Sequence, residues 1–150
     1  MKELRKGPKS FEELVNELET DIRVEEITYF GERMVKEALN PRNVGELANP
    51  SGAARVVDED GRYMQIHLKI EEERITDCKF MTDARGPFIA FGSVLTELVK
   101  GKRVEAAGAL AETDVEAALG GIPEDDEHTP VLAVKALKAA LEDYKIKKRQ

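Results

Sequence analysis

The chain has 150 residues, a net charge of −7 and a pI near 5.0, a length that suits one domain with a hydrophobic core. Its acidic balance argues against nucleic acid as a partner, because nucleic acid binding needs a basic face. One cysteine, no apolar run near the ~18 residues of a membrane span and a polar start without a signal-peptide core predict a cytoplasmic protein without disulfides or membrane segments.

The first predicted element is a short amphipathic helix near the N-terminus. Ser10 and Glu13 have the spacing of a capping box, and apolar residues then recur at helical spacing up to about Thr20. Residues 1–26 are therefore predicted to form an extension that carries this helix. Residues 27–150 are predicted to form the main domain.

A second helix and three strands are predicted next. The helix covers residues 27–39, and it ends there because the residue before Pro41 is disfavoured in a helix. Apolar and polar side chains alternate over residues 64–70, which is typical of a half-buried strand. Residues 74–81 follow an acidic reversal as the return strand, and residues 53–57 form a shorter third strand.

Helices are predicted to fill the rest of the chain. They cover residues 87–99, 104–110, 114–119 and 130–147, and Thr113 is the predicted N-cap of the third of them. A hairpin-based sheet followed by helices is typical of the α+β class. We therefore predict an antiparallel three-stranded sheet with helices packed on it.

The alternation in the central strand also predicts which side chains form the core. The expected core residues are Met64, Ile66, Leu68, Phe80, Leu95, Leu98, Val134 and Leu137. Gln65, His67 and Lys69 alternate with them and are predicted to be exposed. The single cysteine, Cys78, shares a strand face with Phe80 and is predicted to be a buried, small apolar residue.

Four segments carry a family resemblance that runs from about residue 29 to residue 147. The segments are Asn40-Pro41-Arg42-Asn43-Val44-Gly45, then Ile75-Thr76-Asp77 through Phe80, then Leu98-Val99-Lys100-Gly101-Lys102, and finally Leu132-Ala133 with Ala136-Leu137-Lys138-Ala139-Ala140 and Asp143-Tyr144-Lys145. In this order they resemble the NifU/IscU-type iron–sulfur cluster assembly scaffolds. The resemblance implies the scaffold's α+β fold, a role in cluster assembly without enzymatic activity, and a cysteine desulfurase or another cluster-assembly protein as partner.

The family holds its cluster on three cysteines, and this chain lacks all three. The resemblance matches Asp58, Arg85 and Thr129 to the three cysteine positions, while Asp60 and His128 keep the residues of the family. Clusters are held by soft thiolates, which neither aspartate, arginine nor threonine replaces. We therefore expect no bound cofactor, and we expect a protein-interaction or regulatory module of cluster biogenesis.

Three interpretations of the vacated positions remain. Arg85 can form an ion pair with Asp58 or Asp60, while His128 caps the last helix. Alternatively, Asp58, Asp60 and His128 can hold one Zn²⁺ or Fe²⁺ ion, since two carboxylates and an imidazole suit either metal. Finally, the site can bind a small molecule whose carboxylate or phosphate is held by Arg85.

Overall fold

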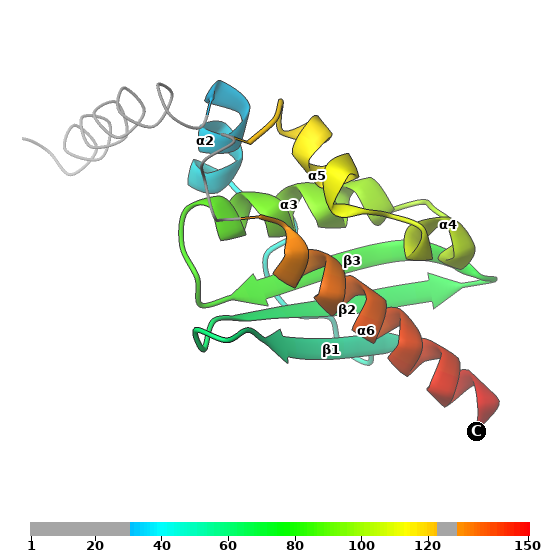
Figure 1. The fold of residues 1–150 in the computed structure, drawn as a ribbon. Coiled ribbons are helices and arrows are strands. Elements are labelled where there is room, and N and C mark those ends of the chain that lie inside the picture. The colour runs from blue at the N-terminus through cyan, green and yellow to red at the C-terminus, as the bar shows by residue number, and fades with distance from the viewer. Residues whose placement is uncertain (1–30, 123–128) are drawn as a thin grey trace, which may run out of the picture.

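A computed structural model of the chain describes residues 31–122 and 129–150. The predicted N-terminal helix and His128 lie outside these residues. Figure 1 shows the described part as a small sheet with helices stacked against it. None of the described helices combines the length and the apolar character that crossing a membrane requires.

The sheet is antiparallel and has the strand order β1-β2-β3. The strands are β1 (Gly52–Val57), β2 (Tyr63–Glu71) and β3 (Arg74–Thr82). All three predicted strands are therefore confirmed, each to within one residue at either end. The reversal between β2 and β3 consists of Glu72 and Glu73, whose φ angles of 52° and 63° lie in the left-handed region.

Five helices are described, and three of their starts differ from the prediction, that of α6 by one residue. They are α2 (Glu32–Leu39), α3 (Pro87–Val99), α4 (Val104–Gly108), α5 (Glu112–Ala118) and α6 (Val131–Arg149). Helix α2 starts later than predicted because Gly31, with φ 97°, is not helical. Helix α5 starts two residues earlier, since the cap is formed by Asp114, whose carboxylate accepts the Ala111 N–H at 2.8 Å, and not by Thr113.

The helices cover one face of the sheet. Helix α6 packs on β1 and β2, α3 packs on β3, and α2 and α5 pack in turn on α3. The predicted core is confirmed, with Leu98 partly buried at its edge and the other seven residues buried. The core is thus the layer between the sheet and the pair α3 and α6.

The segment over residues 40–45, which carries much of the resemblance, closes the outer edge of β3. The carbonyl oxygen of Asn43 accepts the N–H of Phe80 at 2.9 Å, and the N–H of Gly45 donates to the Phe80 carbonyl at 2.9 Å. The Asn43 side chain donates to the Thr96 hydroxyl of α3 at 3.0 Å. This motif therefore joins sheet and helix, and it does so away from the vacated ligand positions.

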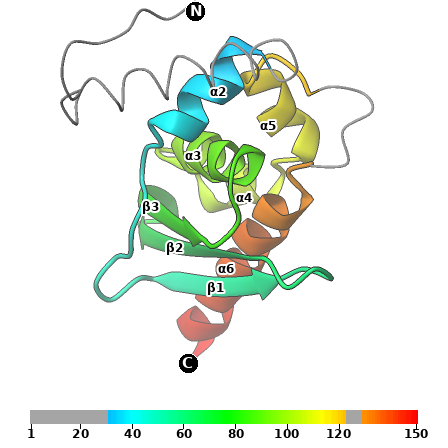
Figure 2. The ribbon, with the colours of Figure 1, turned by 90° about the vertical axis from the view of Figure 1, so that its left-hand side faces the viewer.

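The far face of β2 is more covered than predicted. Gln65 is only 8% exposed, because its amide donates to the Glu46 carboxylate at 2.9 Å. His67 is half-buried, and its Nδ1 accepts the N–H of Leu47 at 3.1 Å. The prediction that Gln65, His67 and Lys69 are exposed is therefore wrong, since the chain between α2 and β1 runs along this face (Figure 2).

Candidate functional site at the end of the sheet

A pocket lies where the β1–β2 hairpin meets the first turns of α3 and α6. Its volume is about 360 Å³, and its lining includes Asp58 from the hairpin, Phe88 from α3 and Lys135 from α6. Thr129, two residues before the start of α6, also lines it. Two of the three vacated ligand positions, Asp58 and Thr129, thus face one cavity, whereas Arg85 is not part of its lining.

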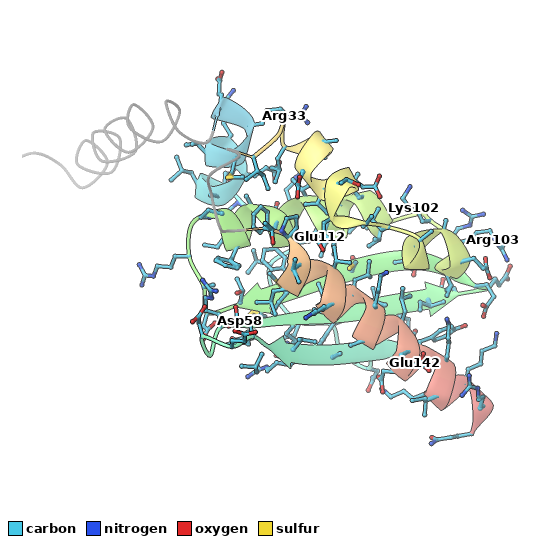
Figure 3. All side chains as sticks on the ribbon, in the orientation of Figure 1. Arg33, Asp58, Lys102, Arg103, Glu112 and Glu142 are labelled. Atoms are coloured by element: carbon cyan, nitrogen blue, oxygen red, sulfur yellow. The ribbon has the colours of Figure 1, made fainter. Side chains whose placement is uncertain are left out.

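Asp58 closes the hairpin at the rim of this pocket (Figure 3). Its Oδ1 accepts the backbone N–H groups of Asp60 at 2.9 Å and Arg62 at 3.0 Å, and its own N–H donates to the Arg62 carbonyl. Desolvation acts to raise the pKa of the Asp58 carboxyl. The hydrogen bonds from Arg62 and Asp60 and the charge of Arg62 outweigh this effect, so the pKa lies below its ordinary value and the carboxylate is ionised at neutral pH.

Arg62 is the cation that pairs with two carboxylates of this acidic hairpin. Its Nε lies 2.9 Å from Asp58 Oδ2, and its Nη2 lies 2.8 Å from Asp60 Oδ2. Its guanidinium carbon also lies 4.6 Å from the centre of the Phe88 ring, a distance at which a cation is attracted to an aromatic face. Arg62 therefore links the hairpin to the start of α3.

The predicted ion pair between Arg85 and these carboxylates is wrong. Arg85 is exposed, and within the described residues it forms neither a hydrogen bond nor an ion pair. Sequence reasoning missed Arg62, which ends the hairpin loop four residues after Asp58. A five-residue hairpin brings its two ends together, and this spacing is the signal that identifies the arginine.

The predicted metal site is only partly described. Asp58 and Asp60 lie close together, since both bind one guanidinium, while His128 lies outside the described residues. In the described ranges, no group of three or more His, Cys, Asp or Glu side chains is arranged to hold a metal ion. Moreover, the positive charge of Arg62 opposes a cation at these two carboxylates.

The donor atoms of the site do not fit an iron–sulfur cluster. The only cysteine of the chain, Cys78, lies in β3 and is fully buried in the core. Burial, and secondarily the charge of Asp77, raises the pKa of its thiol well above the ordinary value. The chain therefore offers no accessible thiolate, and two of the three carboxylates that line the pocket, Asp58 and Asp60, are already paired with a cation.

Comparison with known proteins identifies the family. The model of the family described as "NifU-like N terminal domain" matches residues 30–150. An iron–sulfur cluster assembly scaffold protein IscU of Archaeoglobus fulgidus is 36% identical over 116 residues, which cover 77% of this chain and 76% of the relative. The iron–sulfur cluster assembly enzyme IscU of Drosophila melanogaster is 38% identical over 129 residues, 83% of each chain. The scaffold protein IscU of Escherichia coli is 36% identical over 79% of this chain and 96% of its own.

A solved structure agrees with the described fold. The crystal structure of a putative iron–sulfur cluster assembly scaffold protein from Fervidobacterium islandicum covers 80% of this chain and 96% of its own, with a TM-score of 0.51. At 16% sequence identity this likeness concerns the fold alone. The match over residues 30–150, the three relatives and the α+β architecture together show that the chain belongs to the NifU-like N-terminal domain family.

Proposed function

We propose that this protein is a non-enzymatic interaction or regulatory module of iron–sulfur cluster assembly that acts in the cytoplasm and carries no cluster itself. One observation supports the proposal above all. At the vacated position of Asp58 and at the neighbouring Asp60, the carboxylates are bound by the guanidinium of Arg62 at 2.9 and 2.8 Å. An internal cation thus pairs with the hairpin where the resemblance implies a cluster.

The chemistry of the ligands favours this proposal over a scaffold with altered ligands. Iron and bridging sulfide bind soft thiolates, and the one thiol of this chain is buried in β3. The core, the sheet and the motif that closes β3 are all preserved without those ligands. A preserved fold without the donor atoms is expected when the surface, and not the cargo, is what a partner recognises.

The partner to test first is a cysteine desulfurase, which the resemblance implies. The experiment is a calorimetric titration of the purified chain with the cysteine desulfurase of its source organism. We expect a complex whose formation needs neither iron nor sulfide. If the desulfurase and the other cluster-assembly proteins of the organism all fail to bind, the interaction proposal is wrong.

A second candidate function is the binding of a small molecule in the pocket, which its volume of about 360 Å³ favours. The pocket combines an apolar wall that includes Phe88 and Leu132 with three hairpin carboxylates, two of them paired with Arg62, and with the exposed cation Lys135. Such a site suits a compact molecule with an apolar body and a carboxylate or phosphate group. Thermal-shift screening of such compounds, repeated with Lys135→Ala, tests it, because a genuine ligand loses its stabilising effect in that variant.

The proximity of two carboxylates keeps a mononuclear Zn²⁺ or Fe²⁺ site at Asp58, Asp60 and His128 as a third candidate. If Arg62 excludes the metal, Arg62→Ala should bind Zn²⁺ more tightly than the parent protein in a calorimetric titration. If the parent already binds Zn²⁺ tightly and the variant binds it equally well, a metal-binding function replaces our proposal.

A further inference from the structure

The solvent-facing side of α6 carries a row of basic side chains. Lys135, Lys138, Lys145 and Arg149 are all exposed. At 3.6 residues per turn they fall within an arc of about 80°, and with a rise of 1.5 Å per residue the row is about 21 Å long. Glu142 is the only acidic residue within this arc (Figure 3). We call these four basic residues the α6 basic stripe.

The stripe differs from the other basic residues of the same helix in forming no ion pair with the acidic residues around it, which are Glu142 and, across a pocket, Glu73 and Glu105. Within the described part of the chain, none of its four members forms an ion pair or a hydrogen bond. By contrast, Lys147 binds Asp143 at 3.1 Å, and Lys148 binds Glu73 at 2.6 Å. The acidic residues of this end of the molecule thus neutralise the flank of α6 and leave its outer side positively charged.

The stability of the helix does not account for the stripe. Cations in the last turn complement the helix dipole, which explains Arg149. Lys135 and Lys138 lie beyond the first turn and far from the last, where the dipole favours neither sign of charge. Like charges three or four residues apart also repel, as in the pairs Lys135–Lys138 and Lys145–Arg149. Four cations are therefore held on one side of α6 at some cost to the helix.

We propose that the α6 basic stripe is the surface on which an acidic segment of a protein partner docks. The proposal rests on the interaction function proposed above and names the chemistry of the partner's contact. In a chain of net charge −7, a stripe of four cations is where an acidic segment is attracted and oriented. Ile146, 45% exposed beside the stripe, adds an apolar contact that suits an amphipathic protein segment.

The position of the stripe connects it with the pocket. Lys135 lines the pocket at the end of the sheet, and the stripe continues from it along the full length of α6. In Figure 1, α6 lies across β1 and β2 with its outer side uncovered by any other labelled element. An acidic segment on the stripe therefore reaches the vacated site with one of its ends.

A protein segment fits the stripe better than nucleic acid or a membrane. Glu142 interrupts the row at its centre, and the rest of the chain is acidic. A long polyanion or an extended anionic surface would face repulsion on both sides of the stripe. A short segment whose acidic residues match the four cations avoids this repulsion, because it contacts only the stripe.

The test measures binding to three anionic probes and to the partner proposed above. The probes are a peptide of about 14 residues that carries four glutamates and two leucines, long enough as a helix to follow the stripe, a DNA duplex, and phosphatidylcholine vesicles that contain phosphatidylserine. The stripe variant is Lys138→Glu with Lys145→Glu. The control is Arg33→Glu with Lys36→Glu, which reverses two exposed cations on α2 and gives the same net charge.

We expect the peptide to bind the parent protein and the control, with NMR shift changes that map to α6 and an affinity that falls with salt. The stripe variant should bind at least about tenfold more weakly, as is typical when charges of a complementary surface are reversed. Equal loss in the control, shift changes outside α6, or tighter binding of DNA or vesicles than of the peptide would overturn the proposal.

Binding of the cysteine desulfurase to the parent and to the stripe variant distinguishes a failure of this inference from a failure of the proposed function. If the desulfurase binds the parent and the stripe variant equally well, the function stands and the docking surface is wrong. If the peptide binds at α6 but no cluster-assembly protein binds at all, the surface stands and its assignment to cluster assembly is wrong. Circular dichroism of both variants confirms that the fold is unchanged.

Discussion

Gly92, in the middle of α3, sets how closely this helix approaches β3. A Cβ atom added at Gly92 would lie 2.4 Å from Cδ2 and 2.5 Å from Cε2 of Phe80, where carbon atoms at optimal contact are about 3.5–4.0 Å apart. Phe80 is 2% exposed, so its ring has no free space to move into. Gly92→Ala must therefore push α3 away from the sheet, together with Phe88 at its pocket end.

Gly108 provides a matched control, because it is also helical but has room around it. An added Cβ there meets only Leu141 Cδ1, at 4.0 Å. Both Gly→Ala changes gain about 1 kcal/mol of helix propensity, while overpacking at Gly92 costs about 1–3 kcal/mol. We expect Gly92→Ala to lower the free energy of unfolding by up to about 2 kcal/mol and Gly108→Ala to raise it by up to about 1 kcal/mol.

Guanidinium unfolding of both variants, followed by circular dichroism, measures the difference. In a domain of this size, 1 kcal/mol corresponds to a shift in Tm of about 2–4 °C, so thermal melts provide a second reading. If Gly92→Ala proves as stabilising as Gly108→Ala, then α3 does not pack on Phe80 as described. The arrangement of Phe88 beside Arg62 would then also be in doubt.

Three further predictions concern the hairpin, the response to acid and the thiol. Glu72→Asn should raise the free energy of unfolding by about 0.5–1 kcal/mol in urea titrations, because asparagine adopts the left-handed conformation at less cost than glutamate. Hydrogen bonds from Lys148 and then Tyr144 lower the pKa of Glu73 below its ordinary value of 4.5. The stability this carboxylate adds is therefore present above pH 4.5 and lost as the pH falls through the lowered pKa, so Tyr144→Phe with Lys148→Met should show a smaller loss of stability in acid melts than the parent. Cys78 should react with iodoacetamide only as fast as the protein unfolds, and rapid labelling of the native protein, detected by mass spectrometry, would show that the thiol is accessible.

The elements of the fold follow from local patterns that the sequence displays directly. The period of two in β2 identified Met64, Ile66 and Leu68 as core residues, and the structure buries all three fully. This pattern could not predict that Gln65 is buried, because its burial depends on where the chain between α2 and β1 runs. A period of two specifies which face a side chain takes, and not what covers that face.

The candidate site was likewise predicted only in part from the sequence. The resemblance identified Asp58 and Thr129, and the structure brings both to one pocket. It also pointed to Arg85 as the neutralising cation, because that residue aligns with a lost ligand. The hairpin instead supplies Arg62. Two hydrogen bonds join its backbone to Asp58, and its side chain therefore starts close to the Asp58 carboxylate. The geometry of the hairpin, and not the match of Arg85 to a lost ligand position, therefore determines which arginine pairs with Asp58.

Anaerobic reconstitution tests the central claim, that this family member carries no cluster, most directly. The parent protein and Cys78→Ser are incubated with iron, sulfide and reductant, desalted, and examined by visible absorption and by iron and sulfide analysis. Our account predicts that both remain colourless and retain neither iron nor sulfide, since the one thiol is buried and the Asp58 and Asp60 carboxylates are bound by Arg62. A stable brown species with charge-transfer absorption on the parent protein, and above all one that Cys78→Ser loses, would contradict it.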